Sequence, residues 1–280
     1  MTKPINSTNT STPGKVFLVG AGPGAADLIT VRGAKLLEQA DIVFYDALVD
    51  PEMLLLCPQA VKVAAGKRCG KLSSVQQFIN KRLVDAAQKH QTVIRLKGGD
   101  PMLFGRADEE IQTLKAAGIA VEVVPGITAA LAGAASIQQS LTLRGVSRSV
   151  AFITLAQGTE NLSSGQPIAN PSADTLVYYM GRKDAAKIAQ RLIEQGQYGG
   201  THKQDTPVQI LEAVSTPRER LWSSTLQELA DGKADTWFDS GSPALIMVGE
   251  AFRNQSESTS TKIDNSLQDS LILTNSRRRA

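Results

Sequence analysis

The sequence predicts an α/β protein, because strand-like and helix-like runs alternate along the chain. From Val16 to about Val150, short apolar runs rich in β-branched residues are followed by runs with apolar residues at helical spacing. Such βαβ order gives a largely parallel sheet, whose strands all end at one edge. We expect one ligand crevice at this edge, because several loops that follow a strand contain glycine, at residues 20–24, 66, 98–99 and 126.

The first half of the chain shows this alternation most clearly. Apolar runs predict strands over residues 16–19, 40–46, 60–66, 91–96 and 119–126. Helical spacing predicts helices over residues 27–39, 51–56, 73–89, 106–117 and 128–137. Ser73 or Ser74 would cap the third of these helices, and Gly118 would end the fourth. The last helix is rich in alanine, so other elements can approach it closely.

Polar loops that contain proline and glycine separate the elements of the second half. We expect strands over residues 149–156, 174–180, 206–214 and 242–252, a helix over 184–194 that ends near Gly196, and a strand followed by a helix over 219–229. The pattern changes near residues 145–149. The sequence therefore predicts two α/β domains, residues 15–147 and 148–252, with polar flexible tails at residues 1–14 and 253–280.

Composition and charge narrow the classes of function. Apolar residues make up 42% of the chain and charged residues 20%, as in ordinary globular proteins. The formal net charge of +3 comes from the two ends, so the body is close to neutral, which argues against nucleic-acid binding. Apolar runs stay well below the roughly 18 residues of a membrane span, and residues 1–14 lack the apolar core of a signal peptide.

The chain has two cysteines, Cys57 and Cys69, and two histidines, His90 and His202. Their spacing fits no metal site, so we expect none. Two free thiols suit a reducing cytosol, and we therefore expect a cytoplasmic protein.

The stretch KVFLVGAGPGAADLIT, residues 15–30, resembles a dinucleotide-binding fingerprint. Gly20, Gly22 and Ala25 fit G-x-G-x-x-G/A, and the acidic Asp46 follows about 20 residues later. This pattern favours an NAD(P)-binding dehydrogenase. However, Pro23 has no N–H, which removes a possible pyrophosphate donor from the turn. A strand-to-helix turn without a ligand, and a turn for another ligand, therefore stay open as alternatives.

The stretch VIRLKGGDPMLFGR, residues 93–106, is more informative. Gly98, Gly99 and Asp100 come directly after a strand, and two glycines let a ligand approach the backbone closely. Asp100 can accept hydrogen bonds from a hydroxyl or an ammonium group. An adenosine-type ligand with a cationic amino-acid part suits this loop better than a pyrophosphate. The alternative for Asp100 is a helix N-cap before Pro101.

Seven segments of the chain resemble the tetrapyrrole methylases, and they occur in the order seen in that family. The resemblance runs from about Lys15 to Phe252, which is nearly the whole folded body. Seven ordered segments are far more specific than a single glycine fingerprint. The segments are VFLVGAGPGAADLIT, ADIVFYDALV, AAGKRCGK, VIRLKGGDPMLFGR, VVPGITAALAGA, LVYYMGR and SPALIMVGE.

The resemblance implies a homodimeric, two-domain α/β fold with S-adenosylmethionine (SAM) in the cleft between the domains and S-adenosylhomocysteine as product. It also implies two successive methyl transfers to uroporphyrinogen III, at C2 and C7, which give precorrin-2 for siroheme or cobalamin synthesis. The positions that match the family's cofactor contacts are Pro23, Gly98, Gly99, Asp100, Leu103, Thr128, Ala129, Met180, Val214 and Ala244.

Two further positions match proposed catalytic residues of the family, Asp46 as a general base and Lys67 as a proton donor. A base would assist proton loss after C-methylation. The alternatives are a strand-end cap for Asp46 and a solvated basic loop for Lys67 and Arg68. The substrate is rich in carboxylates, so its candidate partners are Lys67, Arg68, Lys97, Arg106, Arg144 and Arg148.

The chain departs from the family's pattern in places. Ala107 and Asp108 stand where glycines are common, Leu143 replaces a histidine, and Val214 replaces a smaller residue. Residues 199–204 form an extra loop. Val214 puts the shape of the pocket in doubt. The rival functions are a related methylase acting on a later corrin precursor, an RNA or a protein, and a SAM-binding module without catalysis.

Overall fold

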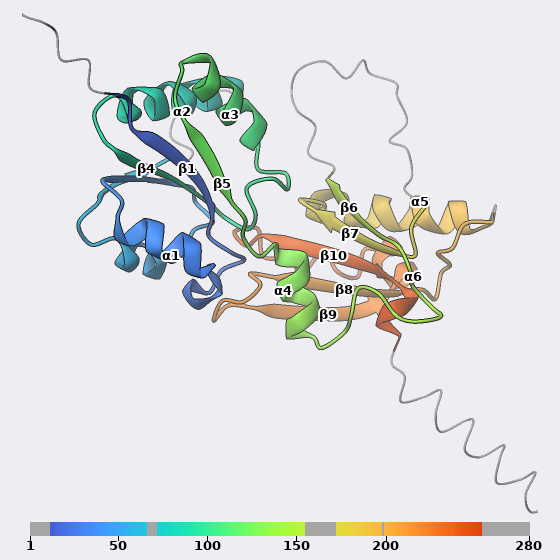
Figure 1. Cartoon of the computed structure of the whole chain (residues 1–280). Coiled ribbons are helices and arrows are strands. Elements are labelled where there is room, and N and C mark those ends of the chain that lie inside the picture. Colours follow the sequence, from blue (N-terminus) through green and yellow to red (C-terminus); the bar gives the residue numbers. More distant parts are fainter. Residues whose placement is uncertain (1–11, 66–71, 155–171, 198, 254–280) are drawn as a thin grey trace, which may run out of the picture.

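The computed structural model describes residues 12–65, 72–154, 172–197 and 199–253. It confirms the α/β fold, as two five-stranded sheets that lie side by side, each with helices packed on it (Figure 1). The first sheet has the order β3-β2-β4-β1-β5, and all its strands are parallel, as expected. Its strands are β1 (Lys15–Gly20), β2 (Ile42–Tyr45), β3 (Val61–Ala64), β4 (Thr92–Lys97) and β5 (Val121–Val124).

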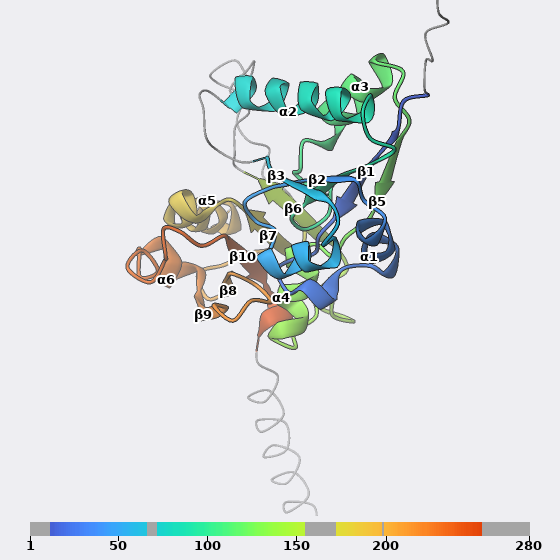
Figure 2. The ribbon, with the colours of Figure 1, turned by 90° about the vertical axis from the view of Figure 1, so that its left-hand side faces the viewer.

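Helices cover both faces of the first sheet. Helices α2 (Leu72–Ala87) and α3 (Ala107–Ala116) pack on one face, over Leu18, Phe44 and Val93. Helix α1 (Val31–Glu38) and the 3-10 helix Pro51–Leu56 pack on the other face (Figure 2). We call this sheet and these helices the first lobe.

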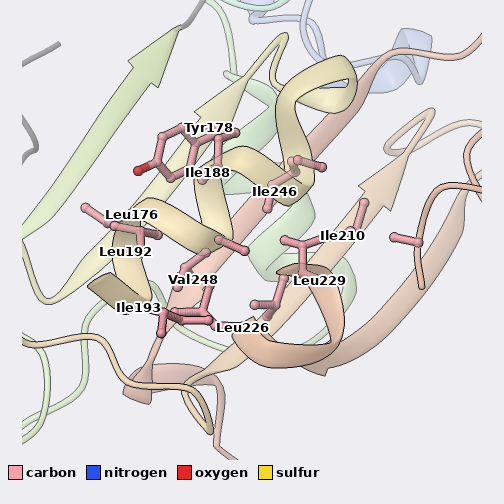
Figure 3. Close-up of a cluster of buried hydrophobic side chains, with 14 of the residues drawn as sticks. Leu176, Tyr178, Ile188, Leu192, Ile193, Ile210, Leu226, Leu229, Ile246 and Val248 are labelled. Carbon is pink, nitrogen blue, oxygen red and sulfur yellow. The ribbon is translucent and has the colours of Figure 1, made fainter. Parts of the chain in front are cut away.

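The second sheet is mixed rather than parallel. Its order is β6-β7-β10-β8-β9, and only the β6–β7 pair is parallel among its described pairs. Helices α5 (Ala185–Gln197) and α6 (Leu226–Ala230) bury one face, where Tyr178, Ile210 and Ile246 meet the helices (Figure 3). The strands are β6 (Val150–Thr154), β7 (Thr175–Tyr179), β8 (Pro207–Glu212), β9 (Arg220–Thr225) and β10 (Ala244–Gly249).

Helix α4 (Ala129–Ser136) packs on the opposite face of the second sheet. Ala130 and Ala134 contact a cluster that includes Leu211 and Met247, and Figure 1 shows the helix lying over β8 and β10. Its small side chains allow this close approach. We call the second sheet with α4, α5 and α6 the second lobe. The domain boundary at residues 147 and 148 stays a prediction.

Two predicted helix starts were wrong. The expected helix over residues 27–39 is a 3-10 turn, Ala26–Leu28, followed by α1, because the Thr30 side chain caps α1 by accepting from Gly33 N at 3.1 Å. Helix α2 begins at Leu72, so Ser73 and Ser74 lie within it. Helix α5 ends at Gln197, close to Gly196 as expected, and a side chain at Gly196 would collide with the His202 carbonyl.

His202 lies between α5 and β8 in the chain, and it is buried, with only 5% of its surface exposed. Its Nε2 lies 3.0 Å from the Ala173 carbonyl oxygen, and its Nδ1 has no hydrogen-bond partner in the described part of the chain. Burial lowers the pKa of His202, although Glu250 and Asp174 act in the opposite direction. The imidazole is therefore neutral in the folded protein at pH 7.

This burial predicts a pH-dependent stability. Below pH about 6.5 the unfolded chain takes up a proton at His202 that the folded protein resists, so the free energy of unfolding falls as the pH drops. Urea unfolding between pH 5 and pH 8 measures this effect. We expect the free energy of unfolding to fall more steeply at low pH in the unsubstituted protein than in His202→Gln. Equal pH slopes in the two proteins would contradict this assignment.

Candidate active site between the two lobes

Three glycine loops meet at the carboxyl ends of the neighbouring strands β4, β1 and β5. Gly22 and Gly99 exchange backbone hydrogen bonds, at 3.2 Å from Gly22 N to Gly99 O and 2.6 Å in return. A Cβ atom on Gly20 would lie 2.5 Å from Gly126 Cα, and one on Gly126 would collide with Gly99 O. The backbones touch because these positions lack side chains. Three of the expected glycine loops therefore lie together at one edge of the sheet, and residue 66 lies outside the described ranges.

Asp100 fastens two of these loops together. Its Oδ2 accepts a hydrogen bond from Gly126 N at 2.9 Å, and its Oδ1 accepts one from Met102 N at 2.8 Å. The nearest following helix, α3, begins only at Ala107, so Asp100 is not a helix N-cap. Leu103 lies half-buried in the same loop. Asp100 thus holds the loop in place, in a position where a carboxylate can also face a ligand.

Gly99 offers the space for such a ligand. Its φ is +69°, a conformation that favours glycine, and no described atom lies within 4 Å of the position of a Cβ. The loop therefore exposes backbone at the point where the sequence predicts a cofactor.

Asp46 follows β2 and lies beside this loop, because β2 and β4 are neighbours. Its Oδ2 accepts from Gly98 N at 3.0 Å, and its Oδ1 accepts from Leu48 N at 2.9 Å. The carboxylate is half-buried. Asp46 therefore does cap the strand end, and it does so next to the Gly98–Asp100 turn. Lys67, Arg68 and Cys69 lie outside the described residues.

The first glycine turn does not form a pyrophosphate site. Ala25 N donates to Ser215 Oγ at 3.2 Å, and a Cβ on Gly24 would lie 2.7 Å from the Val214 carbonyl oxygen. Only a 3-10 turn follows, and α1 begins later, at Val31. In a dinucleotide fold these N–H groups and the helix start would face the phosphates. Here they pack on the second lobe, so the fingerprint reflects contact between the lobes.

The second lobe brings three predicted residues to one edge of its sheet. Strand β10 runs antiparallel to both β7 and β8, so its start lies beside their ends. Ala244 pairs with Glu212, and Ala213 N donates to the Pro243 carbonyl at 3.0 Å. This arrangement places Met180, Val214 and Ala244 along the same edge of the sheet.

The backbone at this edge is strained. Met180, Ala213 and Ser215 have φ values of 56°, 48° and 59°, although none of them is glycine. Left-handed conformations of such residues cost free energy and concentrate at functional sites. Their clustering at the ends of β7 and β8 supports a binding function for this edge.

The side chain of Val214 points away from this edge. It is 4% exposed and packs in the cluster under α4, where a Cβ on Gly133 would lie 3.8 Å from Val214 Cγ2. Replacement of a smaller residue by valine therefore fills the core rather than a pocket.

Tyr179 links the second sheet to the start of α4, and the sequence reasoning missed it. Its hydroxyl lies 2.5 Å from Thr128 Oγ1 and accepts from Ala130 N at 3.1 Å. Burial raises the pKa of Tyr179, so the hydroxyl keeps its proton. The alternation of side chains along β7 could have indicated it. Tyr178 packs under α5, so its neighbour Tyr179 must face the other side of the sheet. Thr128 and Ala129 are thereby fixed relative to Met180.

Two candidate partners of substrate carboxylates are already paired. Lys97 Nζ lies 3.1 Å from Glu110 Oε2 with its side chain 5% exposed, and Arg95 Nε lies 3.1 Å from Glu110 Oε1. Burial lowers the pKa of Lys97, and the charge of Arg95 lowers it further. Arg106 pairs with Glu109 at 2.6 Å on the surface. Lys97 is thus a buried member of an ionic network, whereas Arg144 and Arg148 are exposed.

No described helix is both long and apolar enough to cross a bilayer. No three described His, Cys, Asp or Glu side chains gather in a way that could hold a metal ion.

A parallel sheet whose glycine loops face the strained edge of a mixed second sheet defines a two-lobed binding protein. The chain belongs to the tetrapyrrole methylase family, because a sequence model described as "Tetrapyrrole (Corrin/Porphyrin) Methylases" matches residues 15–230. The two-lobed α/β fold therefore agrees with the resemblance seen in the sequence.

Within this family, the chain is similar to several individual proteins. It is 41% identical over 241 residues to a uroporphyrinogen-III C-methyltransferase of Pseudomonas aeruginosa, covering 86% of this chain and 95% of that protein. It is 43% identical over 248 residues to a siroheme synthase of Zymomonas mobilis, covering 87% of this chain and 50% of that protein. The chain thus spans about half the length of the siroheme synthases that it matches.

A solved structure is also similar. The uroporphyrin-III C-methyl transferase from Thermus thermophilus, complexed with S-adenosylhomocysteine, superposes with a TM-score of 0.71 at 37% identity. The match covers 86% of this chain and 94% of that one.

Proposed function

We propose that this chain is a SAM-dependent methyltransferase that converts uroporphyrinogen III to precorrin-2 by methylation at C2 and C7. The observation that carries the proposal is the 41% identity over 95% of the length of a relative with that activity in its name. The similar structure bound to S-adenosylhomocysteine supports SAM as the methyl donor. Siroheme or cobalamin synthesis would use the product.

The arrangement of several described residues supports SAM as the ligand. The open space at Gly99 and the carboxylate of Asp100 would hold it on the first lobe, together with Gly98, Leu103 and Pro23. From the second lobe we propose contacts with Thr128, Ala129, Met180, Ala244 and the backbone of Val214. SAM supplies a methyl group that its sulfonium already activates, so the protein need not provide a nucleophile.

The work of the protein is then orientation and proton removal. The lobes would align a pyrrole carbon with the sulfur–methyl bond, an effect worth several kcal/mol. As the carbon–carbon bond forms, the sulfur–methyl bond breaks and S-adenosylhomocysteine leaves. Asp46, held by Leu48 N and Gly98 N, would take the proton that the methylated ring releases. From its position in the AAGKRCGK segment, we propose Lys67 as the proton donor.

We also propose that the protein acts as a homodimer in the cytoplasm, and that its domains are residues 15–147 and 148–252. These proposals rest on the family resemblance and, for the cytoplasm, on the two thiols. Gel filtration with light scattering tests the dimer.

Incubation with SAM and enzymatically made uroporphyrinogen III tests the function. We expect loss of substrate and a dimethylated product. No product with no loss of substrate would overturn the proposal, and turnover of a later corrin precursor alone would favour a related methylase. Addition of SAM should raise the melting temperature, whereas NADH should not.

The Asp100→Asn substitution should weaken SAM binding by about tenfold or more, because a charged hydrogen bond contributes roughly 1.5–3 kcal/mol. Isothermal calorimetry measures this affinity. Asp50→Asn is the matched control. Asp50 also precedes a proline, and its carboxylate accepts a hydrogen bond at 2.9 Å from the N–H of Glu52, two residues later in the chain. Equal SAM affinity in Asp100→Asn and the unsubstituted protein would remove Asp100 from the cofactor site.

A further inference from the structure

The turn between β8 and β9, residues 213–219, joins the two lobes. Ala25 N of the first glycine turn donates to Ser215 Oγ in this turn at 3.2 Å. Ala25 lies two residues after Pro23, and Ser215 directly follows Val214. We propose Pro23 and Val214 as cofactor contacts on the two lobes. The hydrogen bond between their neighbours therefore sets the distance between two parts of the proposed SAM site.

The backbone of this turn is strained at Ser215, whose φ is +59°. Thr216 closes the turn, because it donates to the Ala213 carbonyl oxygen from its N–H at 3.1 Å and from its hydroxyl at 2.7 Å. The strained residue itself is held by Glu219, whose Oε2 accepts from Ser215 N at 2.5 Å. Glu219 therefore stabilises the backbone conformation in which Ser215 contacts the first lobe.

The other carboxylate oxygen of Glu219 binds helix α4. Its Oε1 accepts from the hydroxyl of Ser136, the last residue of the helix. Helix α4 begins at Ala129, directly after Thr128, and we propose both of these residues as cofactor contacts. One half-buried carboxylate thus joins the turn after β8 to α4, and through Ser215 it joins both to the first glycine turn.

We infer that Glu219 is a positioning residue for the SAM site, and that it acts through Ser215. The inference rests on the proposed function. Glu219 need not touch SAM, since its two carboxylate oxygens already accept from Ser215 N and Ser136 Oγ. Its effect is to fix the second-lobe contacts against the first glycine turn. A site whose parts are held in place before binding costs less free energy to occupy.

Calorimetry with SAM on Glu219→Ala tests the inference. We expect SAM affinity to fall about tenfold, because hydrogen bonds to a charged group are lost and the site is no longer held in place. Ser215→Ala should cause a similar loss. The double variant should lose about tenfold rather than about a hundredfold, because both residues act through one series of hydrogen bonds. Glu219→Gln, whose amide oxygen can still accept from Ser215 N, should retain most of the affinity.

Hydrogen exchange at the Ala25 amide gives a second readout, in the other lobe. Ala25 N is hydrogen-bonded to Ser215 Oγ, so Glu219→Ala should make this amide exchange several-fold faster. A role of Glu219 confined to the stability of the second lobe would leave exchange at Ala25 unchanged.

Glu228→Ala is the matched control. Glu228 is also half-buried in the second lobe, and its carboxylate accepts from Ser224 Oγ and, at 2.9 Å, from Lys233 Nζ. It lies in α6, on the face of the sheet opposite α4. Its substitution should therefore leave both SAM affinity and exchange at Ala25 unchanged.

Equal SAM affinity in Glu219→Ala and the unsubstituted protein would overturn the inference. Additive losses in the double variant, or unchanged exchange at Ala25, would overturn it as well. Failure of the unsubstituted protein to methylate uroporphyrinogen III refutes the proposed function instead, whatever the ratio of SAM affinities, so the two outcomes are distinct.

Discussion

Asp46→Asn should lower kcat for uroporphyrinogen III by a factor on the order of 10² or more, while SAM affinity changes little. General bases contribute roughly 10²–10⁴ to rate, and an amide cannot take a proton. One oxygen of the asparagine can still accept from Leu48 N or Gly98 N, so the loop should stay folded. Single-turnover methylation and SAM calorimetry on the same protein separate the chemical step from binding.

Asp41 provides a matched control at the opposite end of the same strand. It directly precedes β2, and its Oδ2 accepts from Gln91 N and Thr92 N at 2.9 and 2.8 Å. Asp41→Asn should cost a similar amount of stability, about 1–3 kcal/mol, and leave kcat unchanged. If Asp46→Asn behaves like Asp41→Asn, losing stability but keeping kcat, Asp46 is a strand-end cap and another group is the base.

Glu110→Gln should strongly destabilise the first lobe. Glu110 is fully buried and faces two buried cations, Arg95 and Lys97, at 3.1 Å each. Gln76 also donates to it, at 3.1 Å. Removal of the carboxylate takes away the ion-pair partner that both positive charges share, and loss of one partner of a buried pair typically costs about 3–5 kcal/mol. Urea unfolding measures this loss.

Glu109 is the neighbouring residue on the same helix, and its side chain is 48% exposed in an ion pair with Arg106. Glu109→Gln should change the free energy of unfolding by no more than about 1 kcal/mol, because solvent screens exposed pairs. Equal losses in the two variants would show that burial of Glu110 does not matter. If only Glu110→Gln loses the expected roughly 3–5 kcal/mol, the buried network of Glu110, Arg95 and Lys97 stabilises the first lobe.

The meeting of the glycine loops was predictable from local patterns. Residues 20–24, 98–99 and 126 each follow an apolar run, and parallel strands end at one edge. The reason why these positions are glycines could not be predicted from the sequence. The fingerprint indicated a phosphate, yet Gly20 and Gly126 are glycines because their backbones touch, and Gly24 because it meets the second lobe. The spacing of glycines predicts where another group approaches the backbone closely. It does not predict which group that is.

The second lobe was harder to predict, because its key contacts join distant residues. The alanine pattern identified α4, but nothing local indicates which sheet a helix packs on, and α4 packs on β8 and β10 rather than on the strands before it. The orientation of Val214 depends on the same packing. The Tyr179–Thr128 bond spans 51 residues of sequence, and it could not be found without the register of β7.

The packing of α4 also determines where the molecule can bend. Within the described ranges, the chain passes between the lobes once, at Pro125–Thr128, because β5 belongs to one sheet and α4 to the other. Any rotation of one lobe against the other must be absorbed in this short hinge. Gly126 N in the hinge donates a hydrogen bond to the Asp100 carboxylate, and the Thr128 side chain is hydrogen-bonded to Tyr179. A ligand bound by Asp100 and Thr128, as we propose for SAM, would therefore contact residues that hold both parts of this hinge in place.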